Sequence, residues 1–170
     1  METNLVKKSS KFSSHRFTFF TSIPDLTNNV LNLSLSSKCV YKLIIPSFVK
    51  ISEKKFQVVS VDECAFMGKE GLTSIEIPES VTKIANNAFR DCSNLTDISM
   101  PNTIESIGSW AFMNCSSLKN ISRPEKVKYI KNATFYGCSS LETIGFHDNL
   151  KSIEYYAFAK CCSLKTIVIP

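Results

Sequence analysis

Residues 72–92 read L-T-S-I-E-I-P-E-S-V-T-K-I-A-N-N-A-F-R-D-C, and the same order of apolar residues returns along the rest of the chain. The units begin at Leu72, Leu95, Leu118 and Leu141, and a partial unit begins at Leu164. Successive units start 23 residues apart, as Leu72 and Leu95 do. A fixed period in this range is the signature of a solenoid, in which each repeat contacts only its neighbours.

Each unit divides into three short segments. The stretch L-x-x-I-x-I alternates apolar and polar residues at its end, which is typical of a half-buried β-strand, and Pro78 ends the first such strand. The next segment, V-x-x-I, has the spacing of a second brief extended piece, and A-F-x-x-C has that of a helical turn packed inward. One coil cannot bury its own apolar row, so we expect stacked coils with parallel strands about 4.8 Å apart.

The unit resembles that of the BspA-like leucine-rich repeat proteins, L-x-x-I-x-I-P-x-x-V-x-x-I-x-x-x-A-F-x-x-C, continuously over residues 72–170. The resemblance implies a leucine-rich repeat solenoid of the α/β type, with short parallel β-strands on one face and short helical turns on the other. It also implies the kind of protein found on the surfaces of host-associated microbes and protists, where family members act in adhesion. It implies no catalytic activity.

The period sets the expected domain organisation. We expect a disordered arm over residues 1–21 and an irregular N-terminal cap with a first degenerate repeat over residues 22–71. The regular repeats fill residues 72–170, as units 72–94, 95–117, 118–140, 141–163 and the partial unit 164–170. Three residues depart from the pattern: His147 replaces the strand-ending proline, Thr134 replaces alanine, and Arg123 takes an inward position. Either the Arg123 stem reaches the rim of the core or its strand is locally disturbed.

Composition excludes several classes of protein. Hydrophobic residues make up 44% of the chain, enough for a sizeable core, yet no apolar run approaches the roughly 18 residues that span a bilayer. The net charge is +5, but basic residues alternate with acidic ones instead of forming a stripe, which disfavours nucleic-acid binding. No clear signal peptide precedes the repeats. The resemblance favours the cell surface or secretion, and a cytoplasmic location stays open.

The cysteines follow the repeat. Cys92, Cys115, Cys138 and Cys161 share one position in their units, which predicts a ladder of buried thiols acting as small apolar residues. Oxidation between neighbouring rungs is the alternative, because their Cα separation falls within the disulfide range. No C-x-x-C pair occurs, so we expect no metal and no cofactor.

Catalytic apparatus is sparse in this sequence. His147 is the one histidine within the repeats, where a solvated bend residue is the simpler interpretation than a general base. Neither a G-x-G-x-x-G nor a P-loop motif occurs. The sequence therefore predicts a protein that is not an enzyme.

Two groups of surface residues are candidates for protein binding. One group alternates with the core row on the strands, and consists of Ser74, Glu76, Asp97, Ser99, Asn120, Ser122 and Thr143. The other is aromatic and consists of Trp110, Tyr129, Tyr155 and Tyr156. The first group forms either a plain solvated sheet or a docking surface. The aromatic residues serve either as interface anchors or as packing against the next coil.

Two functions from different classes follow from these candidates. The first is a non-catalytic module for protein–protein binding, of the surface-antigen or adhesion type, whose partner is a host surface or matrix protein. The alternative is a passive spacer or an intracellular scaffold segment within a larger repeat array. Because the last strand is followed by no polar capping repeat, we also expect edge-mediated self-association there.

Overall fold

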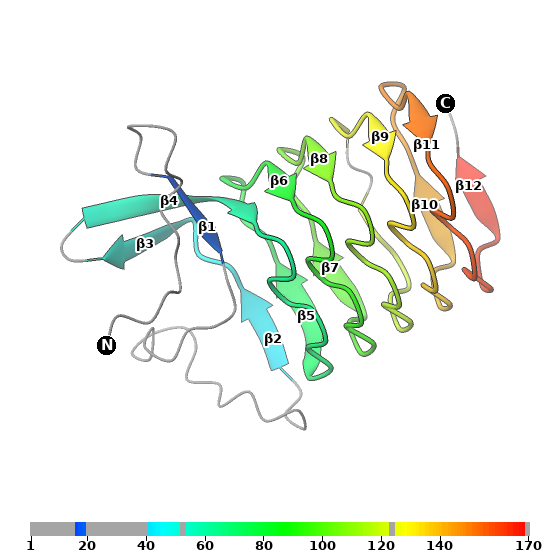
Figure 1. Cartoon of the computed structure of the whole chain (residues 1–170), viewed down its shortest axis with the longest axis horizontal. Helices are drawn as coiled ribbons and strands as arrows, with labels where there is room; N and C mark the ends of the chain where they lie inside the picture. Colours follow the sequence, from blue (N-terminus) through cyan, green and yellow to red (C-terminus); the bar gives the residue numbers. More distant parts are fainter. Residues whose placement is uncertain (1–15, 20–40, 52–53, 123–124, 169–170) are drawn as a thin grey trace.

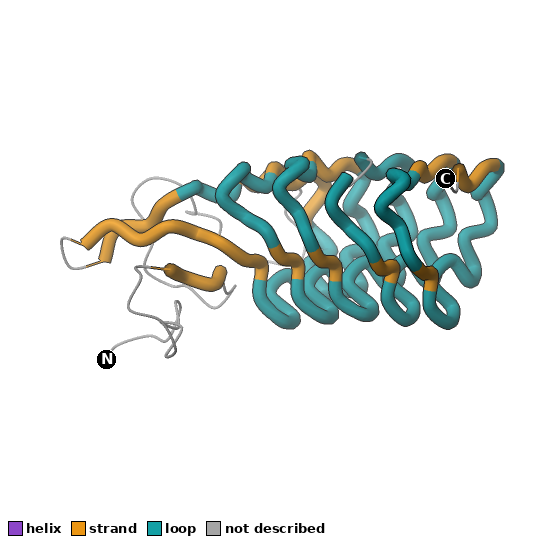
Figure 2. Tube along the Cα trace, turned by 90° about the horizontal axis from the view of Figure 1, so that it is seen from above, coloured by secondary structure: helices purple, strands orange, loops and turns teal. Residues whose placement is uncertain are grey.

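The computed structural model describes residues 16–19, 41–51, 54–122 and 125–168, which form coils stacked along one axis (Figure 1). Two rows of strands run along the stack. The first row contains β2 (Tyr41–Ile44), β5 (Leu72–Glu76), β7 (Asp97–Ser99), β10 (Thr143–Gly145) and β12 (Thr166–Val168). The second row contains β4 (Lys54–Val61), β6 (Lys83–Ile84), β8 (Ser106–Ile107), β9 (Tyr129–Ile130) and β11 (Ser152–Ile153). Turns and loops connect the rows, as Figure 2 shows.

Pairing between neighbouring coils is parallel and keeps the register of the repeat. In the first row Ile75 lies opposite Ile98, and Ser74 lies opposite Asp97. In the second row Ile84 lies opposite both Val61 and Ile107. The predicted parallel stacking and the second extended segment are therefore both confirmed.

The core is a set of ladders, one for each apolar position in the repeat. Leu72, Leu95 and Leu118 are completely buried, as are Phe89 and Phe112, and the last phenylalanine of the stack, Phe158, is partly buried. The rings of Phe66, Phe89, Phe112, Phe135 and Phe158 form a stack with centroids 5.2, 5.3, 5.5 and 5.4 Å apart. Such stacking buries rings that a single coil would leave in water, which is why neighbouring coils depend on one another.

The A-F-x-x-C segments form no helix, and the expected helical turns are absent from the described residues. Two positions in each coil have left-handed backbone conformations, with φ of 55° at Asn87 and 60° at Asp91 in the first regular coil. A left-handed residue every few positions prevents an α-helix from starting. Instead, the N–H groups of Phe89 and Asp91 donate to Ala111 and Met113 of the next coil, at 2.8 Å each. On this side of the solenoid, backbone hydrogen bonds therefore run between neighbouring coils, as they do between the strands of a β-sheet.

The unit 118–140 interrupts the first row of strands. At the place where its strand is expected, the described part contains only an isolated bridge from Asn120 to Thr143 of β10. The Ser122 hydroxyl donates to the Met100 carbonyl oxygen at 3.3 Å. Arg123 lies outside the described residues.

The N-terminal end of the stack departs most from the repeat. β3 (Phe48–Ile51) pairs antiparallel with β4, within the stretch predicted to hold the cap and the first degenerate repeat. β1 (Arg16–Phe19) pairs parallel with β4 and falls inside the stretch for which we expected disorder. The rest of that arm and the first part of the stretch expected to form the cap, residues 1–15 and 20–40, lie outside the described residues.

Candidate binding surfaces

The first candidate group lies on one continuous surface. Glu76, Asp97, Ser99, Asn120 and Thr143 are exposed, and Ser74 is half-buried. Each sits on or beside a strand of the first row, whose intervening residues, such as Ile75 and Ile98, are buried. We call the outward side of β2, β5, β7, β10 and β12, together with Asn120 and Ser122, the first sheet face.

Charged pairs and a depression border the first sheet face. Lys42 lies 3.8 Å from Glu76 at one end, and Lys165 lies 3.0 Å from Glu142 at the other. Where β5 and β7 end, a shallow depression of about 330 Å³ opens. Its lining consists of Glu76, Ile77, Pro78, Glu79, Ser99, Met100, Pro101 and Asn102.

The aromatic candidates lie elsewhere, so the structure separates the two groups. Tyr129 is on β9 in the second row, and Trp110, Tyr155 and Tyr156 lie in the turns that follow the second-row strands. Their exposed fractions are 37% for Trp110, 47% for Tyr129, 69% for Tyr156 and 84% for Tyr155. Tyr155 and Tyr156 are thus mainly exposed, whereas Trp110 and Tyr129 are partly buried.

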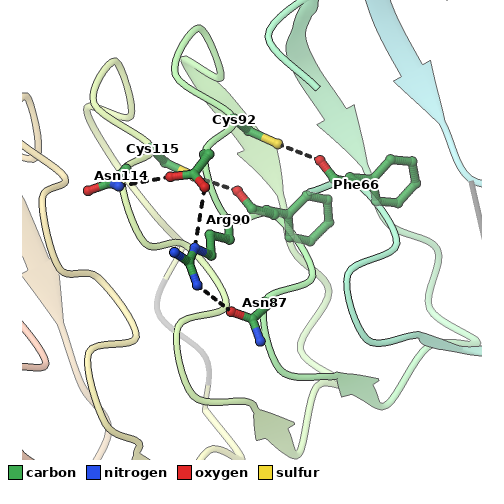
Figure 3. A network of polar contacts seen from close by, with 8 residues as sticks. Phe66, Asn87, Arg90, Cys92, Asn114 and Cys115 are labelled. Carbon is green, nitrogen blue, oxygen red and sulfur yellow. Dashed lines mark hydrogen bonds and ion pairs between the residues drawn. The ribbon is translucent and has the colours of Figure 1, made fainter. Parts of the chain in front are cut away.

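The four repeated cysteines have a structural role. Each thiol donates to the carbonyl oxygen of a phenylalanine in the preceding coil, as from Cys92 to Phe66 at 2.9 Å and from Cys115 to Phe89 at 3.1 Å (Figure 3). The same bond runs from Cys138 to Phe112 and from Cys161 to Phe135, at 3.1 Å each. Burial raises the pKa of Cys92 to about 12 and that of Cys161 to about 11. The cysteines of the described residues are free thiols, and the buried ones are poor nucleophiles and poor metal ligands.

A polar ladder runs beside the thiols. The Asn114 amide donates to the Asp91 carboxylate at 2.8 Å, and the Arg90 guanidinium lies 3.3 Å from the same carboxylate (Figure 3). Asp91 and Asn114 both have left-handed backbones, with φ of 60° and 59°. These groups hold the turns of adjacent coils together, so we do not count them as a binding site.

The described part of the chain offers few groups for catalysis or for metal binding. His147 lies in the turn after β10, half-buried, and no side-chain hydrogen bond joins it to another described residue. No cluster of three or more metal-ligating side chains occurs among residues 41–51, 54–122 and 125–168. The same residues contain no helix with the length and apolar character needed to cross a bilayer.

One feature of the second row was missed by reading charges along the sequence. Lys128 and Lys151 occupy the same position in neighbouring coils, just before β9 and β11. They are 23 residues apart, so only an alignment of the repeats places them together.

Stacked coils, parallel strand ladders and repeated inward leucines define the chain as a leucine-rich repeat solenoid. The family described as BspA type Leucine rich repeat region matches residues 59–170, with 6 copies of the repeat. The chain therefore belongs to the BspA-type leucine-rich repeat family. A comparison with curated protein sequences gave no match.

Solved bacterial proteins share this fold. The chain is similar to the T. pallidum Leucine Rich Repeat protein, with a TM-score of 0.74 and 26% identity over 90% of this chain and 63% of that one. It is also similar to a leucine-rich repeat protein from Eubacterium ventriosum, with a TM-score of 0.66 and 28% identity over 76% and 32% of the two chains. A leucine rich cell surface protein from Faecalibacterium prausnitzii gives a TM-score of 0.75 at 24% identity, over 99% of this chain and 44% of that one. The chain thus spans less than two thirds of the length of these relatives.

Proposed function

We propose that the chain is a non-catalytic module that binds proteins through its first sheet face, in the manner of a surface adhesin. The observation that carries this proposal is the flat row of small polar side chains along β5, β7 and β10. Asp97, Ser99 and Thr143 are exposed and take no part in the core. A face of this kind presents polar groups at the regular interval of the coils, and its backbone is fixed by the core beneath.

The depression at the end of β5 and β7 supplies a place for an anchor residue. Its lining includes the acidic residues Glu76 and Glu79 together with Pro78, Met100 and Pro101. A basic side chain of the partner would meet the carboxylates while its stem packs on the prolines. Membership of a leucine-rich repeat family supports a role in protein interaction.

Charge reversal on the first sheet face tests the proposal. We would measure binding of the wild-type chain to a panel of purified extracellular-matrix proteins by biolayer interferometry, with serum albumin as the blank. The variant Glu76→Lys/Asp97→Lys should weaken any specific binding by about tenfold or more, because like charges across an interface are strongly unfavourable. The matched control Glu63→Lys/Glu105→Lys makes the same charge change at exposed residues away from this face.

Each outcome has a definite meaning. Selective loss in the first variant supports docking on the first sheet face. Equal binding by both variants, or no binding to any member of the panel, contradicts the proposal and favours the spacer or scaffold function. Antibody staining of intact against permeabilised cells tests the surface location separately.

A further inference from the structure

Two neighbouring lysines, Lys128 and Lys151, lie directly before strands of the second row. The backbone N–H of Lys151 donates to the carbonyl oxygen of Lys128 at 2.7 Å, so the two residues lie side by side in the stack. Both are exposed, and neither forms an ion pair within the described residues. Like charges at adjacent positions of a ladder repel each other. An anionic ligand would relieve that repulsion.

Aromatic rings lie along the same two coils. Tyr129 directly follows Lys128 and lies on the outer side of β9, where it is 47% exposed, while the next residue, Ile130, is buried. Tyr155 is 84% exposed and comes shortly after β11, the strand that pairs with β9. Lys128, Tyr129, Lys151 and Tyr155 therefore form an exposed strip of positive charge and flat apolar rings, which we call the basic aromatic strip.

We propose that the basic aromatic strip binds an acidic oligosaccharide. The ammonium groups of Lys128 and Lys151 meet sulfate or carboxylate groups, and the rings of Tyr129 and Tyr155 stack on the C–H faces of the sugars. Charge complementarity selects an anionic ligand, and the exposed rings select one with flat apolar faces, which an acidic peptide lacks. Glu105 takes the position of Lys128 in the preceding coil, so the positive run is too short for a continuous polyphosphate chain.

This site is separate from the first sheet face, so it can fail or succeed without the protein-binding proposal. Four variants test it within the full chain, and each introduces a residue that another coil already has at that position. Lys128→Thr/Lys151→Thr copies Thr82, and Tyr129→Ser copies Ser106 and Ser152. The control Lys119→Thr/Lys165→Thr copies Thr73 and Thr96, and removes the same charge beside the first sheet face. Tyr155→Ser tests the second ring.

Isothermal titration measures binding of a heparin octasaccharide, an oligogalacturonate, a neutral dextran fragment, a polyglutamate peptide and a single-stranded oligonucleotide. The wild type should bind a sulfated or a carboxylated sugar in preference to the other three, and comparison of the two tells which anion is recognised. Lys128→Thr/Lys151→Thr should weaken that binding by about fivefold or more, and each tyrosine variant by a similar factor.

Three results would overturn the inference. The first is no binding of either acidic sugar at millimolar concentration. The second is an equal loss in the Lys119→Thr/Lys165→Thr control, which would mean that only net charge matters. The third is tighter binding of the peptide or the oligonucleotide than of both sugars. Circular dichroism of each variant confirms that the coils remain folded.

Discussion

The thiol of Cys115 donates a hydrogen bond to the carbonyl oxygen of Phe89, 3.1 Å away in the preceding coil. Both residues are fully buried, and the ring of Phe89 stacks on that of Phe112 at 5.3 Å. The bond thus joins two coils at the point where they also share the aromatic stack. A thiol is small enough for this site and still donates a second hydrogen bond to the Phe89 carbonyl, which also accepts the Cys92 N–H at 3.2 Å.

Removing this thiol should destabilise the stack. Cys115→Ala removes one of the two hydrogen bonds that the Phe89 carbonyl accepts and leaves a small void, so the free energy of unfolding should fall by about 1–2 kcal/mol. Urea denaturation followed by circular dichroism measures the change. Cys162→Ala is the control, because Cys162 is exposed and should change stability by less than about 0.5 kcal/mol. Equal effects of the two substitutions would contradict a structural role for the ladder.

Burial of the thiols also predicts how stability depends on pH. The pKa of Cys92 is raised from 9.0 to about 12, chiefly because burial disfavours the thiolate, and burial raises the pKa of Cys115 in the same direction. In the unfolded chain these thiols ionise above about pH 8.5, whereas in the folded chain they keep their protons. The unfolded state then binds fewer protons, so stability is full below the unfolded pKa of about 8.5 and falls as pH rises toward 12.

Comparing the pH dependence of stability in a cysteine variant and in the wild type separates the contribution of the thiol from that of other titrating groups. The free energy of unfolding, measured from pH 8 to pH 11, should fall less steeply for Cys92→Ala than for the wild type. Identical slopes would mean that the folded thiol ionises as readily as the unfolded one.

Thiol reactivity should divide the cysteines by position. Cys64 and Cys162 are exposed and should react with iodoacetamide at pH 8, whereas Cys92, Cys115 and Cys138 are buried and should not. Peptide mass spectrometry reports the extent of labelling at each cysteine separately. In urea all of them should react. Rapid labelling of Cys115 in the native chain would show that the coils open locally.

The sequence predicts the core far better than the turns. The 23-residue period places Leu72, Phe89 and Cys92 inside because stacking leaves no other arrangement for them. The A-F-x-x-C spacing, by contrast, suits both a helical turn and a series of tight turns. Asp91 and Gly137, at one of the left-handed positions, favour turns, but Lys160 occupies the same position and hides the pattern.

Among the surface candidates, too, the sequence predicts the residues on strands better than those in turns. Alternation along a strand placed Glu76 and Asp97 outside, and the structure agrees. The proximity of Lys128 and Lys151 depends on coils stacking in register, so it emerges only when charges are compared at equal positions in the repeat. The aromatic residues could not be assigned to core or surface from the sequence, because the turn conformation decides which way they face.

The left-handed turns lead to a final prediction that compares two glycines at the same position in the repeat. Gly68 and Gly137 have φ of 68° and 73°, so alanine at either site pays for a left-handed backbone, about 1–2 kcal/mol. A Cβ at Gly68 meets nothing within 4 Å, whereas at Gly137 it comes to 2.5 Å from the Asn114 side-chain oxygen. That amide cannot turn away freely, because its nitrogen donates to Asp91 at 2.8 Å.

Gly137→Ala should therefore lower the free energy of unfolding by more than Gly68→Ala does, by roughly a further 1 kcal/mol for the disturbed amide bond. Urea denaturation of both variants measures the difference. In the background of Asn114→Ala the two glycine substitutions should cost the same, since the obstructing oxygen is gone. If Gly137→Ala stays the more harmful there, the penalty arises from the backbone and not from the Asp91–Asn114 ladder.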